Sequence, residues 1–219
     1  MDDDFAESSN TQEHVYDRDG KLCWLCNHKT SVHIAHHIDA AASSFFRFHD
    51  YGTIPSTVTD PSHHDNLIPL CPNCHAAYDA AFPEWILVPD EKTLQEYINH
   101  EKMDYEQRCT ASITPPRSLP ILDRRKILYH PFIITHKYHE FLGPQSNPPK
   151  WPKSWLGEPT TVIHRALRGV FESTPVQQFS FPGRGRGRGK WQTGVPEIFR
   201  LLINELINLW SRQPPSQKK

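Results

Sequence analysis

The chain has 219 residues, enough for one or two small domains with a hydrophobic core. No apolar run approaches the length of a membrane span, and the acidic N-terminus is unlike a signal peptide. We therefore expect an intracellular protein, nuclear or cytoplasmic, with no membrane partner. In such a reducing setting, paired cysteines bind metal more often than they form disulfides.

The formal net charge of −1 hides an uneven distribution along the chain. Residues 1–109 contain 7 Lys and Arg against 19 Asp and Glu, a balance of −12. Residues 110–219 contain 17 against 6, a balance of +11. The acidic half suits the capture of a cation, and the basic half has the sign that nucleic acid requires. The alternative is that the two halves attract each other; we favour contact with nucleic acid.

The chain is expected to begin with a disordered tail over residues 1–19, because this segment is acidic and shows no hydrophobic periodicity. A module over residues 20–109 follows. Its first strand is expected over residues 31–36, where apolar and polar side chains alternate. The long segment 39–65 comes next, and we expect its phenylalanines at positions 45, 46 and 48 to pack over the core.

A second strand, rich in Leu and Ile, is expected over residues 66–71, followed by a helix from about Cys74 toward Ala81. Asp90 has the position of an N-cap for another helix that ends near Arg108. The buried stripe of that helix is expected to contain Leu94, Tyr97, Ile98 and Tyr105.

Beyond Cys109 the composition changes, because 14 of the 20 prolines lie there. This predicts a proline-rich basic extension over residues 110–182, with no long regular element before about residue 160. A short helix is expected over residues 161–172. The Gly-Arg tract at residues 183–190 cannot bury a core and is expected to be mobile.

Residues 191–219 contain a terminal helix that begins at Pro196 and is apolar nearly all round. Such a helix has to be buried. It therefore packs either on its own domain or against a partner, which would be another protein or a second copy of the chain.

Two Cys-x-x-Cys pairs, Cys23/Cys26 and Cys71/Cys74, carry the strongest chemical signal. Four thiolates complete the tetrahedral coordination of a structural zinc ion and leave no position open for chemistry. The alternative is a core of unliganded thiols, which the paired spacing disfavours. Cys109 has no partner in this pattern and is expected to be a free thiol.

With these pairs around it, the arrangement of His36-His37, Asn66 and His75 resembles the HNH endonucleases of the ββα-metal type. The resemblance covers about residues 20 to 90. It implies a zinc-stabilised ββα-metal module in which His37 is the general base and Asn66 orients the loop and the base. The adjacent histidines are similar to those of the colicin-type nucleases, which implies that His36 and His75 bind a catalytic metal.

Asp79 lies one helical turn after His75, at the spacing that brings two side chains to one face. The colicin-like pattern has a histidine at this later position. A carboxylate shifts the preference toward Mg²⁺ or Mn²⁺ and away from Zn²⁺.

Each of these residues also has a structural alternative. His36 and His37 could be buried structural histidines, His75 could cap the helix or serve the zinc, and Asp79 could simply be solvated. His63 and His64 are expected to be a solvated loop pair and His33 to be structural.

The Gly-Arg tract resembles the arginine-glycine segments of proteins that bind RNA and single strands. Guanidinium groups contact phosphates and stack on bases without sequence preference. The candidate nucleic-acid contacts are Arg184, Arg186, Arg188 and Lys190. The alternative is a flexible linker that happens to be basic.

The sequence thus predicts an α+β fold, with a zinc-stabilised ββα-metal module, a proline-rich basic extension and a terminal helix. The expected function is endonucleolytic cleavage of DNA with Mg²⁺ or Mn²⁺ as the catalytic metal and Zn²⁺ as the alternative metal. DNA is the expected partner, and RNA and single strands are further candidate partners. Two rivals are a zinc module that binds nucleic acid without cleaving it and an interaction protein in which the zinc unit is only a scaffold.

Overall fold

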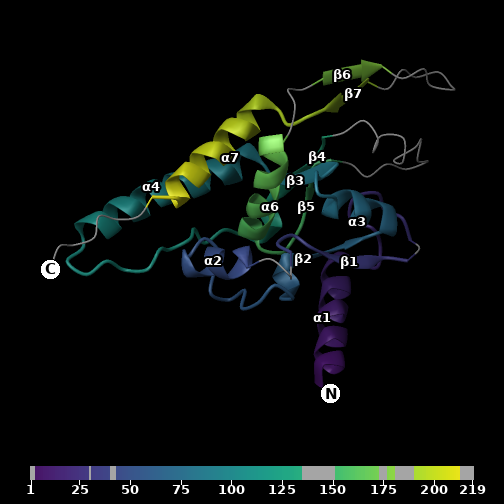
Figure 1. Cartoon of the computed structure of the whole chain (residues 1–219), viewed down its shortest axis with the longest axis horizontal. Helices are drawn as coiled ribbons and strands as arrows, with labels where there is room; N and C mark the ends of the chain where they lie inside the picture. Colours follow the sequence, from purple (N-terminus) through teal and green to yellow (C-terminus); the bar gives the residue numbers. More distant parts are fainter. Residues whose placement is uncertain are drawn as a thin grey trace.

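The computed structural model describes a mixed α and β fold with small antiparallel sheets. Its described residues are 3–29, 31–39, 43–134, 151–172, 177–180 and 190–212. Within these, the description is of the backbone alone for residues 3–9, 171–172, 177–180 and 190–193. Figure 1 shows α4 and α7 side by side at one end of the molecule and the β1, β2 and α3 unit at the other.

The predicted strand–strand–helix unit is present. Strands β1 (His33–His36) and β2 (Leu67–Leu70) pair antiparallel, with His36 opposite Leu67. Helix α3 (Pro72–Asp79) follows β2 directly, with Pro72 in its first turn, where the missing N–H costs no hydrogen bond. The end of β1 and the start of β2 therefore lie together, beside α3.

The segment between these strands packs partly on itself. It contains the short helix α2 (Ser44–Asp50) and the 3-10 turn η1 (His64–Asn66). Phe45 is buried with Ile38, Ile54 and Val58 in a small separate cluster, whereas Phe46 is 58% exposed. The prediction that all the phenylalanines pack over the module was wrong for Phe46, because α2 directs neighbouring side chains to different faces.

A sheet that the sequence pattern did not predict occupies the centre of the molecule. Strand β3 (Trp85–Pro89) pairs antiparallel with β4 (Leu128–Ile133), and β5 (Lys153–Ser154) pairs with the first two residues of β4. β3 is buried along its whole length, so it shows a continuous apolar run and no alternation. β5 does not reach Pro131 of β4, so a residue without an N–H is tolerated there.

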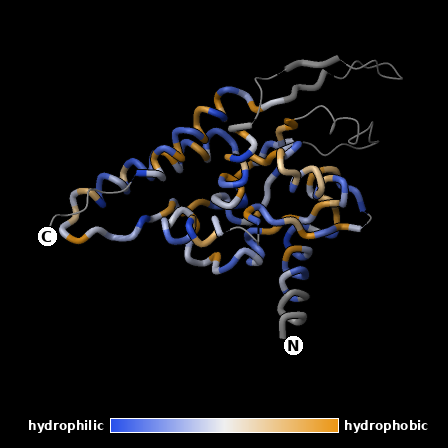
Figure 2. The backbone as a smooth tube through the Cα atoms, in the orientation of Figure 1, coloured by the Kyte–Doolittle hydropathy of each residue, from blue (hydrophilic) through white to orange (hydrophobic). Residues whose placement is uncertain are grey.

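The long helices lie where the pattern predicted them. Asp90 caps α4 (Glu91–Thr110) by accepting a hydrogen bond from the Thr93 N–H at 2.8 Å. α6 (Pro159–Glu172) packs on β3. α7 (Glu197–Trp210) packs on α4 and α6 through Phe199, Leu202, Ile203, Leu206, Leu209 and Trp210. One face of the terminal helix is thus buried on its own chain, whereas Ile198 and Leu201 on the other face are exposed. Figure 2 shows hydrophobic and hydrophilic positions alternating along α4 and α7.

The cysteine module and the later part of the chain share one core. The cluster that contains the four cysteines also contains Ile127, Tyr129, Ile133, Trp155 and Val162. β3 separates it from a second cluster, formed mainly by α4, α6 and α7. The boundary predicted near residue 109 therefore does not separate two cores.

Helix α1 (Asp3–Asp19) stands where the acidic composition predicted a disordered tail. Val15 is fully buried, and Arg18 donates hydrogen bonds to the carbonyl oxygens of His64 and Leu67 at 2.8 and 2.6 Å. The prediction was wrong because the contacts that order this helix come from η1 and β2, which are distant in sequence. Its N-terminal end projects away from the rest of the molecule (Figure 1).

A short hairpin, β6 (Gln177–Ser180) with β7 (Lys190–Thr193), precedes α7. The Gly-Arg tract between its strands lies outside the described residues, as do Arg184, Arg186 and Arg188. Lys190 opens β7, where only the backbone is described. Across the described residues, none of the helices has the length and apolar character needed to cross a membrane.

His164 of α6 is buried between two aromatic rings, with ring centroids 3.8 Å from Phe48 and 4.9 Å from Trp210. The Thr53 hydroxyl donates to the Phe48 carbonyl at 3.0 Å, so its oxygen is left to accept the Nε2–H of His164, also at 3.0 Å. Burial lowers the pKa of His164 to about 3. His164 is therefore neutral in the folded protein at physiological pH.

This burial predicts acid sensitivity. His164 has a pKa near 6.5 in the unfolded chain and about 3 in the folded protein, so its burial costs no stability above pH 6.5. Below pH 6.5 the unfolded chain binds the proton first, and the free energy of unfolding falls. Between pH 7 and 5, the wild type should lose about 2 kcal/mol more unfolding free energy than His164→Phe. Urea unfolding at both pH values measures the difference. Equal losses in the two proteins would contradict the assignment.

Candidate functional site

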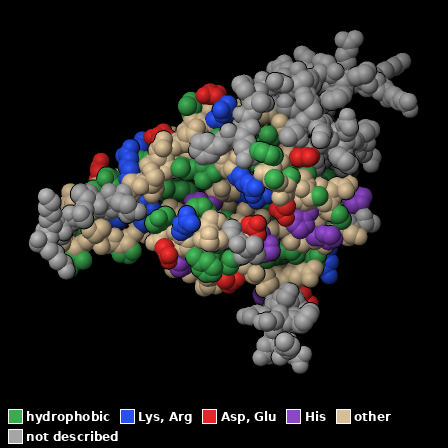
Figure 3. Space-filling model, viewed as in Figure 1, with side chains coloured by type: hydrophobic (Ala, Val, Ile, Leu, Met, Phe, Trp, Pro, Cys, Tyr) green, Lys and Arg blue, Asp and Glu red, His purple; other side chains and the backbone are tan. Residues whose placement is uncertain are grey.

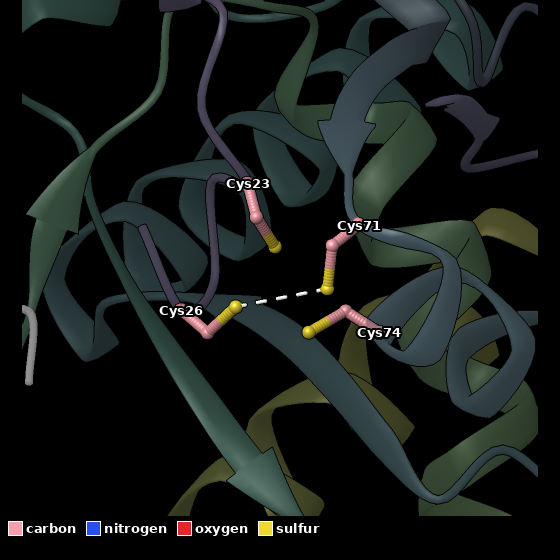
Figure 4. A group of neighbouring side chains, drawn as sticks. All are labelled: Cys23, Cys26, Cys71 and Cys74. Carbon is pink, nitrogen blue, oxygen red and sulfur yellow. Dashed lines mark hydrogen bonds between the residues drawn. The ribbon is translucent and has the colours of Figure 1, made fainter. Parts of the chain in front are cut away.

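Four cysteine side chains converge on one buried point. Cys23 and Cys26 come from the turn after α1, and Cys71 and Cys74 from the start of α3. Figure 4 shows the four sulfur atoms directed toward one another. All four lie within 4.8 Å of one another, and Cys26 Sγ is 3.7 Å from Cys71 Sγ. A tetrahedral zinc ion with Zn–S bonds of about 2.3 Å places its sulfurs roughly 3.8 Å apart, so the site fits zinc.

Local backbone geometry builds this centre. In the first knuckle, the Asn27 N–H donates to the Cys23 carbonyl at 2.8 Å, and Asn27 has a φ of 59°, which asparagine tolerates better than most residues. The Trp24 N–H donates to the Pro69 carbonyl at 2.8 Å, which ties this knuckle to β2. Cys71 is the N-cap of α3, so the second pair lies in the first turn of that helix. The four-cysteine group predicted from the spacing is therefore confirmed as a cluster able to bind one metal.

Asn66 fixes the loop that follows β1. Its Oδ1 accepts from the Ile38 N–H at 3.0 Å, and its Nδ2 donates to the Ile38 carbonyl at 2.9 Å and to the Pro61 carbonyl at 2.7 Å. The His37 N–H donates to the Asn66 carbonyl at 2.9 Å. The fully buried amide thus holds both backbone groups of Ile38, and the Asn66 carbonyl holds the backbone of His37.

His37 is 1% exposed, so it lies inside the fold and not at its surface. Its Nδ1 is 2.5 Å from the Tyr78 hydroxyl, and its ring meets the edge of Trp155 at a centroid distance of 4.5 Å. Nε2 is buried, with no hydrogen-bond partner among the described residues. Burial lowers the pKa of His37 well below its usual value, and the nearby Arg165 lowers it further. The ring is therefore neutral at physiological pH.

His75 and Asp79 form a pair on α3, with His75 Nε2 2.8 Å from an Asp79 carboxylate oxygen. The other Asp79 oxygen is 3.4 Å from the guanidinium of Arg165. His36 is half-buried, and burial lowers its pKa, while Asp79 and Asp39 act in the opposite direction. The structure thus places His36 within the electrostatic reach of His75 and Asp79. The three do not form one of the compact ligand groups, with donor atoms within 4.8 Å, found among the described residues.

The second compact group of that kind is His63, His64 and Asp65. Both Asp65 oxygens already face guanidinium groups, with Arg124 at 2.6 Å and Arg18 at 3.6 Å. His63 Nδ1 accepts from the Asp65 N–H at 3.2 Å. Two fixed positive charges beside the one carboxylate of this three-residue group disfavour a cation here.

Three residues of this region were not singled out from the sequence. Tyr78 bonds to His37, Trp155 covers it, and Arg165 donates to the Tyr78 carbonyl and lies over the Tyr78 ring at 4.6 Å. Tyr78 lies in the predicted helix three residues after His75, a spacing that could have indicated it. Trp155 and Arg165 have no local signal, because they reach the site from the residue after β5 and from α6.

The chain matches no protein-family model, and comparison with curated proteins and with solved structures finds no significant similarity.

Proposed function

We propose that the chain is an endonuclease that hydrolyses DNA phosphodiester bonds with a divalent metal, and that its β1, β2 and α3 unit is a zinc-stabilised ββα-metal module of the HNH type. His37 would be the general base, and His36, His75 and Asp79 would hold the metal. The structural zinc of the four cysteines would have no role in the reaction.

One observation carries this proposal. A single buried amide, that of Asn66, binds both backbone groups of Ile38, the residue after His37. These hydrogen bonds stabilise the loop after β1, and they also fix the backbone beside His37. A fixed position suits a general base, because misplacing a base by even 1 Å lowers a rate strongly.

The chain's own residues would divide the chemistry. Neutral His37 can accept a proton from water, since burial keeps it uncharged. Two imidazoles and one carboxylate suit a divalent first-row ion, and the carboxylate favours Mg²⁺ or Mn²⁺. When bound, such an ion supplies charge stabilisation at the phosphate and the leaving oxygen. Arg165 holds Asp79 and the end of α3 in place from α6.

The burial of His37 favours a second candidate function, a zinc module that binds nucleic acid without cleaving it. Trp155 closes over His37, and its Nε1–H donates to Asp19 of α1 at 3.2 Å, while Arg18 lies over its ring at 5.1 Å. For His37 to reach water, Trp155 has to move. A cavity of about 420 Å³, lined by Trp155, Trp24 and Lys153 among others, lies beside it and offers the space.

Nicking of supercoiled plasmid by the zinc-loaded protein tests the proposal. We expect nicking with Mg²⁺ or Mn²⁺ and none with EDTA. Trp155→Phe removes the hydrogen bond to Asp19, worth about 1 kcal/mol, and should speed nicking roughly five-fold by uncovering His37. Trp151→Phe is the matched control, because Trp151 packs at a tilt against Trp24, with ring centroids 5.0 Å apart. If neither the wild type nor Trp155→Phe nicks DNA while folded and zinc-loaded, the non-catalytic module is the better description.

A further inference from the structure

Two arginines of α6 reach the C-terminal end of α3. Arg165 donates to the carbonyl of Tyr78, and Arg168 donates to the carbonyl of Ala81 at 2.9 Å. The last carbonyls of a helix lack partners within the helix and carry partial negative charge, so cations are favourable there. Arg165 therefore holds the end of the helix that presents His75 and Asp79, and Arg168 holds the chain just after this helix, at Ala81.

The two arginines differ in how far contacts within the protein already use their charge. Arg165 is buried, lies over the Tyr78 ring and faces Asp79, so its charge is used inside the protein. Arg168 is exposed, and among the described side chains no carboxylate is within ion-pair distance of it. Its anchor to Ala81 uses one of five N–H donors. The side chain is exposed, and the hydrogen bond to Ala81, just after α3, fixes its position.

A phosphate that approaches this region meets unfavourable charge. Asp79 is half-exposed at the end of α3, where the helix dipole is also negative. Figure 3 shows Lys and Arg side chains over α6 on the same face as histidines over α3 and β1, with acidic side chains between them. The basic side chains over α6 offer the nearest favourable charge on this face. A DNA strand that reaches the histidines would therefore place its next phosphate over α6.

We propose that Arg168 binds a DNA phosphate that flanks the cleaved bond, and so sets where the strand lies on the His36, His75 and Asp79 surface. This assignment rests on the proposed nuclease function. Because one hydrogen bond already holds the guanidinium, little side-chain entropy is lost when it binds a phosphate. Two of its parallel N–H groups match two phosphate oxygens. The contact is to the backbone, so it confers position and not sequence preference.

Salt-dependent DNA binding tests this role. Affinity of the zinc-loaded protein for a short fluorescent duplex is measured by anisotropy between about 50 and 200 mM salt, without added Mg²⁺ or Mn²⁺. Loss of one phosphate contact reduces the magnitude of the negative slope of log K against log salt by about 0.9. Near 0.1 M salt this change corresponds to roughly eight-fold weaker binding. We expect this of Arg168→Ala, whereas Arg168→Lys keeps the charge and most of the slope.

Arg212→Ala is the matched control, because Arg212 is exposed just beyond α7. Figure 1 shows α7 and α3 on opposite sides of the molecule. Arg212→Ala should leave the slope unchanged while altering the net charge equally. If Arg168→Ala and Arg212→Ala have the same slope as a DNA-binding wild type, the role of Arg168 is overturned and the nuclease proposal stands. A wild type that binds no DNA overturns both.

Discussion

Removing the metal from the four-cysteine centre is expected to unfold the module. A structural zinc site contributes about 10–16 kcal/mol at pH 7, as much as or more than the whole stability of a typical domain. The effect should reach beyond the knuckles, because Trp155 and Val162 share the core of the four cysteines. Cys71→Ser, or a strong chelator, should therefore remove both the zinc and the cooperative unfolding transition.

Cys109→Ser is the matched control, since Cys109 lies on α4, outside the cluster. It should retain about one zinc per chain and a normal transition in circular dichroism. A Cys71→Ser protein that lacks zinc but unfolds with the wild-type midpoint would show that the four cysteines are only core thiols.

His37→Ala is expected to lower the rate of DNA cleavage by about 10²–10⁴-fold, the range for loss of a general base. His37 has no ligand role in the proposed site, so affinity for DNA and for the added metal should stay close to wild type. His100→Ala, a histidine change on the surface of α4, controls for the substitution itself. A His37→Ala protein that cleaves at the wild-type rate would remove the base from the mechanism.

Asn66→Ala should also slow cleavage, by less than His37→Ala, because it loses orientation and not the proton acceptor. The structure also predicts that Asn66→Ala lowers the free energy of unfolding. The buried amide makes three hydrogen bonds, each worth about 1 kcal/mol, so about 3 kcal/mol is at risk. The rate should therefore be measured at low temperature and corrected for the folded fraction.

The parts of the fold that could be predicted from sequence have local signals. The cysteine spacing indicated the metal cluster, the Asp90 cap and its apolar stripe indicated α4, and the apolar run after Pro196 indicated α7. In each case the signal itself lies within a short stretch of chain, although the partners can be distant: the two cysteine pairs are 45 residues apart, and α7 packs on α4. Local propensity and long-range packing agree at these places.

The parts that were missed depend on distant contacts. β3 lacks alternation because both of its faces are buried, and its partner β4 lies about 40 residues further along the chain. α1 is acidic, yet it is ordered by carbonyl groups of η1 and β2. Trp155 reaches His37 from a segment more than 100 residues away, so no pattern around His37 could show that it is covered.

Manganese binding is the most direct test for a second, open metal site beside the zinc centre. Mn²⁺ is titrated into zinc-loaded protein, and free Mn²⁺ is followed by electron paramagnetic resonance. We expect about one Mn²⁺ per wild-type chain, affinity reduced at least about ten-fold in His75→Ala, and no change in His100→Ala. Wild-type protein that takes up no Mn²⁺, or His75→Ala that binds it equally well, would contradict a catalytic metal at His36, His75 and Asp79.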